Sequence, residues 1–393
     1  MNKAYKVVIV LIVVTTLLVI NLDSLIFGAE RPKLKGKIAF VSHKLYLEKR
    51  GEEEKCKEGY AIWAMNADGS DRTRITKSIG LEESKFSLDA CDSAPGGLNW
   101  SPDGKVLAFH QPQSWIHPPS LFVINSDGTN LKLLTKGGCN PDWSPDSKWL
   151  VFSGGEIVLV TGKGYKLKEE NIYKIEIDGK NLQLLAKDGH NPKWSPDGKR
   201  IAFIRETYIK EKSYNERKIC FVGSDSRDEK VLISTKEVKK FFWLSERKIV
   251  FQTETSYIQV IDISNSTVQK ILPIKRERGE GSLLSCSPDG KKIIFFLREK
   301  VDGKNGCSIW IMGADGKDPK RIIFIISDLS FARYHCWSPD GKWLAIATYD
   351  GNIRLVNIES GEMYNISNNP PLYNASNPYP QEMVHDYCFS WSK

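Results

Sequence analysis

One five-residue unit, Trp-Ser-Pro-Asp-Gly, recurs along the chain and constrains its fold more than any other feature of the sequence. Full, altered or truncated copies begin at Trp100, Trp143, Trp194, Trp243, Cys286, Trp337 and Trp391. Successive copies lie 43 to 54 residues apart, and self-similarity at such a period is the signature of a solenoid or a propeller. Six of the eleven tryptophans occupy this one position, so the repeat decides the architecture.

Each copy is followed by the pattern of short β-strands. Ser-Pro-Asp-Gly is turn chemistry, because proline presets φ, aspartate bonds its own backbone and glycine accepts a positive φ. An apolar run such as Val106–Phe109 follows the turn, and a second run such as Leu121–Ile124 ends in a hairpin signal, Asp127-Gly128. A third short run closes the unit. With the strand before the Trp, each repeat holds four strands that are too short to be helices.

The two ends of the chain complement each other. Residues 36–42 match the run that follows a Trp-Ser-Pro-Asp-Gly turn but lack the turn, and Asp386–Trp391 supplies the missing innermost strand. Pairing these segments closes a circle and removes exposed sheet edges. We therefore predict an all-β fold, a seven-bladed β-propeller over residues 36–393, closed by pairing the C-terminal strand with the N-terminal strands.

The Trp-Ser-Pro-Asp-Gly units resemble those of the TolB-type propellers, which are relatives of the WD-repeat family, and the resemblance covers essentially everything after residue 35. TolB itself is six-bladed with a separate N-terminal domain, whereas few residues here separate the N-terminal apolar segment from the first strand. The resemblance therefore implies the scaffold and not the role of TolB. It also implies a link to peptidase propellers and to some polysaccharide lyases, in which the same unit occurs.

The first 29 residues have the pattern of an export signal. Lys3 and Lys6 precede an apolar run, Val7–Ile20, as in a secretory signal peptide. The alternative is an uncleaved membrane anchor, since the 21 residues Val7–Phe27 match the ~20 that span a bilayer. Both interpretations place the propeller in the periplasm or on the extracytoplasmic face of the membrane.

Composition and cysteine spacing exclude several other classes of protein. A net charge of +8 over 393 residues is too dilute to indicate a nucleic-acid-binding protein. Eight cysteines suit an oxidising compartment, but no Cys-x-x-Cys pair indicates a zinc site. Cys56 and Cys91 are expected on two loops of one blade and are the first candidates for a disulfide.

Because strands alternate in direction, the predicted ring has two different faces. The Ser-Pro-Asp-Gly turns and the Asp-Gly hairpins share one face, the turn face. The other, the long-loop face, carries long variable connections such as His43–Gly59 and Asn368–His385. Binding residues concentrate on loops held by a rigid scaffold, so we expect a protein or peptide partner on the long-loop face.

Candidate binding residues lie where the innermost strands reach the long-loop face. The position four residues before each motif start holds Gly96, Cys139, His190, Lys239, Ser282, Arg333 and Tyr387. This basic and polar ring suits a carboxylate, an acidic sugar or an acidic peptide, and a solvated channel rim is the competing interpretation. We predict partner binding by residues in and beside this ring: His190, Lys239, Lys240, Arg333, His335, His385 and Asp386.

No catalytic constellation accompanies the repeat. Several near-identical Ser-Asp pairs around a ring are scaffold turns, so Asp103, Asp146, Asp197, Asp289 and Asp340 are interpreted as turn caps. No nucleophile elbow, His-Glu-x-x-His or phosphate-binding loop is present. We predict a monomeric binding scaffold without catalytic residues, metal or cofactor.

Two alternatives stay open. A metal-assisted enzyme acting on acidic polysaccharide would need His110, His190, His335 and His385 to converge on one point. A passive envelope module with weak, multivalent contacts would need no defined site at all.

Overall fold

The computed structural model describes residues 32–50, 53–76, 96–111, 119–155, 157–160, 164–167, 169–209, 214–235, 238–253, 257–273, 284–326, 335–348, 352–367 and 382–392. Every regular element in these ranges is a β-strand. They contain no helix long and apolar enough to cross a membrane. The predicted export segment, Cys91 and the side chain of Cys56 lie outside the described residues, so the predicted disulfide is not tested.

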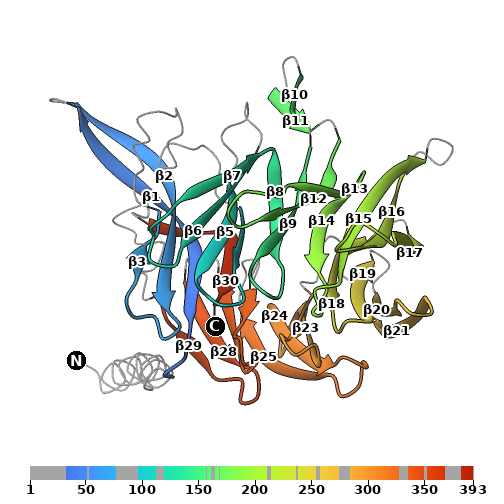
Figure 1. Cartoon of the computed structure of the whole chain (residues 1–393). Helices are drawn as coiled ribbons and strands as arrows, with labels where there is room; N and C mark the ends of the chain where they lie inside the picture. The colour runs from blue at the N-terminus through green and yellow to red at the C-terminus, as the bar shows by residue number, and fades with distance from the viewer. Residues whose placement is uncertain are drawn as a thin grey trace, which may run out of the picture.

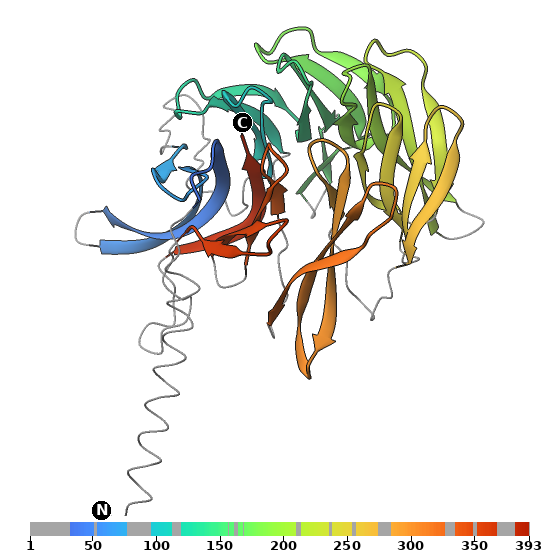
Figure 2. The ribbon, with the colours of Figure 1, turned by 90° about the horizontal axis from the view of Figure 1, so that it is seen from below.

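Seven four-stranded antiparallel sheets follow one another around a ring (Figures 1 and 2), which confirms the predicted seven-bladed β-propeller. From the innermost strand outwards, blade 1 holds β30 (Glu382–Trp391), β1 (Lys37–Arg50), β2 (Glu53–Asn66) and β3 (Thr73–Arg74); blade 2 holds β4 (Gly96–Trp100), β5 (Val106–Gln111), β6 (Ser120–Asn125) and β7 (Lys132–Lys136). Blade 3 holds β8 (Gly138–Trp143), β9 (Trp149–Gly154), β12 (Asn171–Glu176) and β13 (Gln183–Ala186); blade 4 holds β14 (His190–Trp194), β15 (Arg200–Ile209), β16 (Tyr214–Gly223) and β17 (Lys230–Thr235).

The remaining blades follow the same order. Blade 5 holds β18 (Val238–Trp243), β19 (Lys248–Thr253), β20 (Tyr257–Asp262) and β21 (Thr267–Pro273); blade 6 holds β22 (Leu284–Cys286), β23 (Lys292–Val301), β24 (Lys304–Gly313) and β25 (Lys320–Ile326). Blade 7 holds β26 (His335–Trp337), β27 (Trp343–Ala347), β28 (Ile353–Asn357) and β29 (Met363–Asn365), and the separate hairpin β10 (Ile157–Val160) and β11 (Gly164–Leu167) belongs to the connection between β9 and β12.

Blade 1 closes the ring by combining both ends of the chain, as predicted. β30 pairs antiparallel with β1, and Ile38 lies opposite Trp391. Lys37 N–H donates to Ser392 Oγ and Ser392 N–H donates to Lys37 O, both at 2.9 Å. Gly36 has φ +90° and a Cβ there would lie 2.0 Å from Ser392 O, so only glycine permits this closure.

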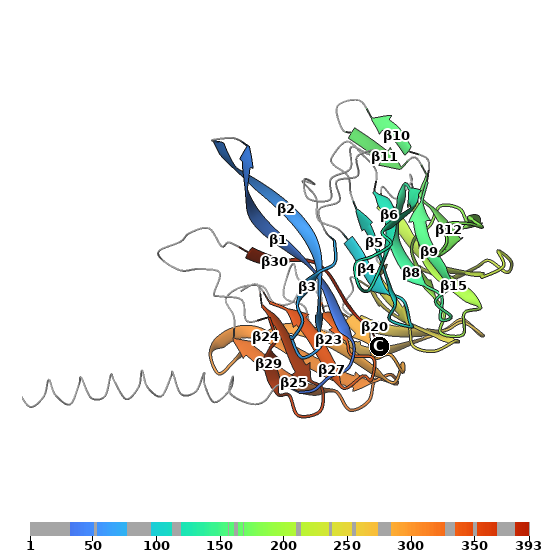
Figure 3. The same ribbon diagram turned by 60° about the vertical axis from the view of Figure 1, so that its left-hand side comes forward.

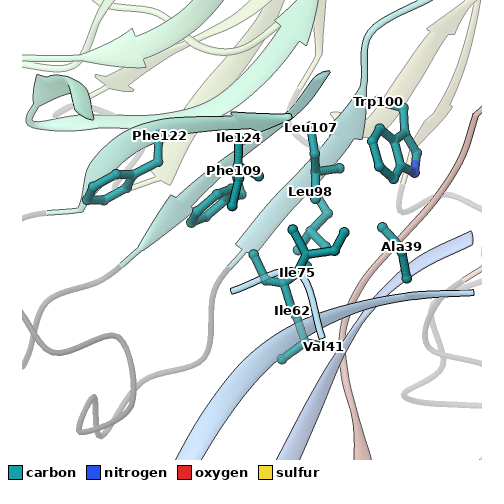
Figure 4. Packing of buried hydrophobic residues seen from close by; sticks show 11 residues of the cluster. Ala39, Val41, Ile62, Ile75, Leu98, Trp100, Leu107, Phe109, Phe122 and Ile124 are labelled. Atoms are coloured by element: carbon teal, nitrogen blue, oxygen red, sulfur yellow. The ribbon is translucent and has the colours of Figure 1, made fainter. Parts of the chain in front are cut away.

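The hydrophobic core is divided among the seven seams between adjacent blades. Each of seven apolar clusters contains buried residues of two neighbouring blades, so every blade is packed on both sides. Figure 4 shows the seam of blades 1 and 2, in which Val41 and Ile62 face Leu98 and Phe109. Burial of these side chains, at about 25 cal/mol per Å² of apolar area, holds the ring together.

The repeated Trp, which ends six of the seven innermost strands, packs against the preceding blade. Trp100 belongs to the seam of blades 1 and 2, and Trp143 to the seam of blades 2 and 3. The indole Nε1–H of Trp143 donates to Asn99 O of the preceding blade at 2.8 Å. Trp243 repeats this bond with Lys193 O at 3.0 Å. The Trp of the motif is therefore a tie between blades.

The Ser-Pro-Asp-Gly segments are closed turns, which confirms the interpretation of their aspartates as turn caps. Ser144 Oγ donates to Asp146 Oδ1 at 2.6 Å and accepts the N–H of Trp149 at 2.9 Å. The bond from Ser144 holds the pKa of Asp146 below its ordinary value, with further help from the Lys148 N–H. The same contacts recur at the turns that begin at Ser101, Ser195, Ser287 and Ser338. These serine hydroxyls and carboxylates serve the turns and do not form a catalytic pair.

The long-loop face is marked by two projecting hairpins. The tip of β1 and β2 and the hairpin β10–β11 extend from the same side of the ring (Figure 3). The Ser-Pro-Asp-Gly turns lie at the opposite ends of the innermost strands. Each innermost strand therefore begins at the long-loop face and ends at the turn face.

Candidate functional site

The innermost strands of four consecutive blades are bulged near their starts. Pairing with the second strand shifts register within β4, β8, β14 and β18. In three of them the residue three positions before the Trp is left-handed, with φ of 61° at Gly97, 52° at Asn140 and 53° at Asn191. Such bulges redirect side chains and concentrate next to functional sites. Asparagine and glycine are among the residues that adopt this conformation most readily.

The bulges border a cavity of about 300 Å³ in the central channel. Nearly all of its lining comes from the innermost strands of blades 2 to 5, and the residues are Gly97, Leu98, Asn99, Asn140, Pro141, Asn191, Pro192, Lys193, Ile204, Lys240, Phe241 and Phe242. The cavity thus combines carboxamides and two lysines with an apolar wall. A concave, mainly apolar site with a few convergent polar groups is the usual form of a ligand pocket.

One of the two lysines is neutralised by a neighbouring blade. Lys193 Nζ lies 2.7 Å from Asp142 Oδ1, which also accepts a bond from Asn99 Nδ2 at 3.3 Å. The second oxygen, Asp142 Oδ2, accepts the N–H of Trp194 at 2.9 Å. This carboxylate therefore ties blades 2, 3 and 4 together and fixes the Lys193 side chain at the cavity.

The other lysine, Lys240, has no hydrogen bond or ion pair among the residues that the structure describes. Surrounding protein atoms lower its pKa below the ordinary lysine value, and no described acidic group opposes this shift. Lys240 is near enough to His335 to help lower the pKa of that histidine to about 3, although burial is the larger cause. The described lining therefore carries one uncompensated positive charge, which favours a ligand with one carboxylate.

The predicted ring four residues before the motif lies just outside this cavity. Gly96, Cys139 and His190 pair with their second strands, whereas the cavity is lined by residues one to three positions before the Trp. Of the predicted partner-binding residues, Lys240 lines the cavity. His190 lies at the start of β14, and its pKa is lowered by burial against the opposing effect of Glu170 and Glu206.

The other predicted partner-binding residues contribute less to the described site. The His335 ring packs against Phe296 at a tilt of 39°, with ring centroids 5.0 Å apart, and its buried Nδ1 has no partner among the described residues. Arg333 and the side chains of Lys239, His385 and Asp386 lie outside the described part of the chain. Binding by these residues stays a prediction.

Of the histidines that the metal-assisted alternative requires, His110 is engaged within the protein, and the side chain of His385 lies outside the described residues. His110 Nδ1 accepts the N–H of Asn140 at 3.3 Å, and burial lowers the pKa of His110 to about 4. A Cβ at Gly96 or Gly97 would lie 2.6 to 2.7 Å from its ring, so the two glycines make room for the imidazole. The described residues contain no group of three His, Cys, Asp or Glu side chains that could hold a metal ion.

Our sequence analysis missed the two left-handed asparagines of the cavity. The sequence did contain a signal for these asparagines, since Asn140-Pro141 and Asn191-Pro192 stand at equal distances before two copies of the motif. Asparagine is among the few residues that tolerate a left-handed backbone. A repeated asparagine just before the innermost Trp therefore indicated a bulge at the channel.

Comparison with known proteins supports the fold. Residues 326–372 match the WD40 domain of anaphase-promoting complex subunit 4. An uncharacterized protein of Agrobacterium fabrum, Atu1656, is 23% identical over 157 residues, which is 37% of this chain and 47% of that protein. The match thus spans about half of the relative's length.

Solved structures with this fold include three enzymes of low sequence identity. An oligogalacturonate lyase of Vibrio parahaemolyticus has a TM-score of 0.53 at 11% identity, covering 84% of this chain and 86% of that one. The periplasmic gluconolactonase of Pseudomonas aeruginosa has a TM-score of 0.51 at 11% identity, covering 91% and 98%. A prolyl endopeptidase has a TM-score of 0.56 at 14% identity, covering 83% of this chain and 49% of that one. Together with the seven sheets and the recurring Trp-Ser-Pro-Asp-Gly turns, these matches show that the chain has the fold of a seven-bladed β-propeller with WD-like repeats, which is consistent with the resemblance to TolB-type propellers.

Proposed function

We propose that this propeller is a binding scaffold that takes a protein or peptide segment at its long-loop face, with the channel cavity as the anchoring point. The observation that carries the proposal is the convergence of four blades on one cavity with two left-handed asparagines and an uncompensated lysine. A carboxamide offers both a donor and an acceptor, which is the pair that a peptide backbone presents. Phe241, Phe242 and the two prolines provide an apolar surface for a side chain of the segment.

The charge of the cavity indicates an acidic segment. Lys193 is neutralised by Asp142, so Lys240 supplies the unpaired charge of the described lining. An ammonium group that is partly removed from water is stabilised by a carboxylate of the ligand. A carboxylate on the bound segment would therefore contribute to affinity and would fix its direction in the channel.

The N-terminal segment supports a setting outside the cytoplasm. The basic start and the apolar run of residues 1–29 have the pattern of an export signal or anchor. The partner would then be a protein or peptide of the cell envelope, and the propeller would act as a monomer.

Selection from a peptide library tests this proposal. A phage library of random 12-residue peptides is panned on the immobilised full chain, and enriched peptides are retested by calorimetry. We expect acidic peptides whose affinity falls about tenfold with K240M, as expected for loss of one charge-assisted bond of about 1.4 kcal/mol. N191D keeps a residue that tolerates the left-handed backbone but adds a negative charge, so it should also weaken binding.

The matched control is K199A, which removes an exposed lysine from the turn face. Its affinity for the selected peptides should equal that of the unmodified protein. No enrichment of peptides, or equal affinity for K240M and the unmodified chain, would contradict the proposal.

A further inference from the structure

The seam between blades 3 and 4 contains a lysine at a position that is apolar in every other blade. Lys174 of β12 lies opposite Val151 of β9. The positions with the same register in the other six blades are Ala64, Val123, Phe221, Val260, Ile311 and Leu355. All six are at most 7% exposed and belong to seam clusters. Lys174 therefore places a cation at a position that is apolar and buried in the other six blades.

A cavity of about 330 Å³ opens at the turn face beside Lys174. The Ser-Pro-Asp turn of blade 3 and the Asp-Gly turn of blade 4 border it, together with Trp149, Trp194 and Ser224. The first residue of the second strand is also tryptophan in blade 7, but Trp343 is buried and its ring packs on Tyr364. In blade 3 the Trp149 ring instead faces Lys174, whose Nζ lies 4.8 Å from the ring centroid.

The groups around this cavity are only partly used by the protein itself. Lys174 Nζ donates to Ser224 O at 2.6 Å, which leaves two ammonium hydrogens for other acceptors. Burial lowers the pKa of Lys174, although Asp225 opposes this shift. Asp146 uses Oδ1 for its turn, and its Oδ2 has no partner among the described residues. The cavity thus offers donors, acceptors and an indole wall.

The balance of these groups favours an uncharged ligand. Asp197 is paired with Arg200 and Asp225 with Arg227, each at 3.7 Å, so Lys174 and Asp146 remain and the local charge is close to zero, which favours neither an anion nor a cation. An organic cation would have to displace Lys174 from the face of Trp149. What remains is a neutral molecule with an apolar face and several hydroxyl groups, since hydroxyls both donate to carboxylates and accept from an ammonium group.

We propose that this cavity, which we call the seam site (Ser144, Asp146, Trp149, Lys174, Asp197 and Ser224), binds a neutral saccharide unit. The sugar ring would contact the half-buried indole of Trp149, while its hydroxyls bond to Lys174 and to the carboxylate of Asp146. The seam site lies on the turn face between blades 3 and 4 and shares no lining residue with the channel cavity, so it does not depend on the function proposed above. A site of this kind also explains why a polar residue is kept in an apolar seam, because functional positions are where local rules of stability are broken.

A glycan array carrying neutral and acidic glycans tests the seam site with the full chain and three variants. K174L introduces the residue that blade 7 has at this position, K174M keeps an unbranched apolar chain without the ammonium group, and K180A removes an exposed lysine of the neighbouring hairpin as the control. We expect the unmodified chain and K180A to retain neutral glycans. We expect both Lys174 variants to lose at least tenfold in signal.

Thermal melting of the same proteins separates a binding role of Lys174 from a structural one. If Lys174 serves a ligand, K174L restores the apolar seam and raises the melting temperature by about 1–3 °C. A lower melting temperature would show that the contacts with Ser224 and Trp149 stabilise the seam, and would overturn the proposal. Preference for acidic glycans, unchanged binding by K174L, or no retained glycan at all would also overturn it.

Discussion

Replacing the repeated tryptophans by phenylalanine should destabilise the ring unequally, depending on the indole N–H. Trp143 and Trp194 are 5% and 9% exposed, and each packs in the seam with its preceding blade. Trp143 Nε1–H donates to Asn99 O at 2.8 Å, whereas Trp194 Nε1 is buried without a partner among the described residues. W143F and W194F therefore remove similar apolar volumes, but W143F removes a hydrogen bond whereas W194F removes a buried donor that has no partner among the described residues.

The expected difference follows from the cost of hydrogen bonds made and not made. W143F loses a net contribution of about 1 kcal/mol from the bond to Asn99 O. W194F removes a buried donor whose unsatisfied state costs at least about 1 kcal/mol. The loss of apolar contacts is common to both variants, so W143F should be less stable than W194F by about 2 kcal/mol.

Equilibrium unfolding in urea, followed by far-ultraviolet circular dichroism, measures this difference without relying on the fluorescence of the mutated residues. The m-values of the two variants should agree, because both expose the same surface on unfolding. W243F serves as a replicate, since Trp243 Nε1–H donates to Lys193 O at 3.0 Å, and its loss of stability should resemble that of W143F. If W194F is as unstable as W143F, the indole bonds between blades do not contribute as we argue.

Three further predictions concern the turns, the buried histidine and the thiols. Ser287→Ala removes the bonds to Asp289 Oδ1 and from Lys292 N–H, so it should lower the unfolding free energy by about 1–2 kcal/mol and raise the pKa of Asp289 in an NMR titration. The pKa of His335 is about 3 in the folded chain, against an ordinary value of 6.5, so the unfolded chain binds more protons at pH values between the two. The free energy of unfolding should therefore fall as the pH drops from 6.5 towards 3, and His335→Phe should make the melting temperature less dependent on pH over this range. Burial raises the pKa of five described free cysteines, Cys139, Cys220, Cys286, Cys307 and Cys336, which should react with a thiol reagent only after denaturant is added. Peptide mapping assigns the label, and rapid labelling of any of these five in the native protein would contradict their placement.

The fold was predictable because its information lies in short segments that each specify one local structure. The Ser-Pro-Asp-Gly turn determines where two strands reverse, and the apolar runs determine the strands on both sides. The missing turn before Gly36 and the unpaired strand that ends at Trp391 together predicted the closure. Apart from this closure, the contacts within each blade join strands that follow one another in the sequence, and each blade repeats the last.

The channel residues were harder to predict, because a bulge changes which side chains face the channel. Aligning the strands on the repeated Trp assigns each side chain to a face of the strand by its distance from Trp in the sequence. The extra residue of the bulge near Gly97, Asn140 or Asn191 shifts every earlier side chain to the other face. The ring predicted four residues before the motif was therefore displaced from the cavity. Lys240, one position later, was selected only as a neighbour of that ring.

A residue that departs from its repeat is a candidate binding position when it lines a cavity, and a change of packing when it does not. Lys174 and Lys240 differ in chemical character from the residues at the equivalent positions of the other blades, and each lines a cavity. Cys286 also departs from its repeat, since it stands where the motif has tryptophan. It lines neither cavity, however, and packs against the cluster of Ile293 and Phe295 while its Sγ lies 3.4 Å from Trp243 O. In a ring whose blades are stabilised by the same contacts, a departure that is filled by neighbouring side chains changes only the packing. A departure that leaves an open, polar space is only partly compensated within the chain, as Lys174 is by Ser224 O and the Trp149 ring, and in our proposals a ligand supplies the remaining contacts.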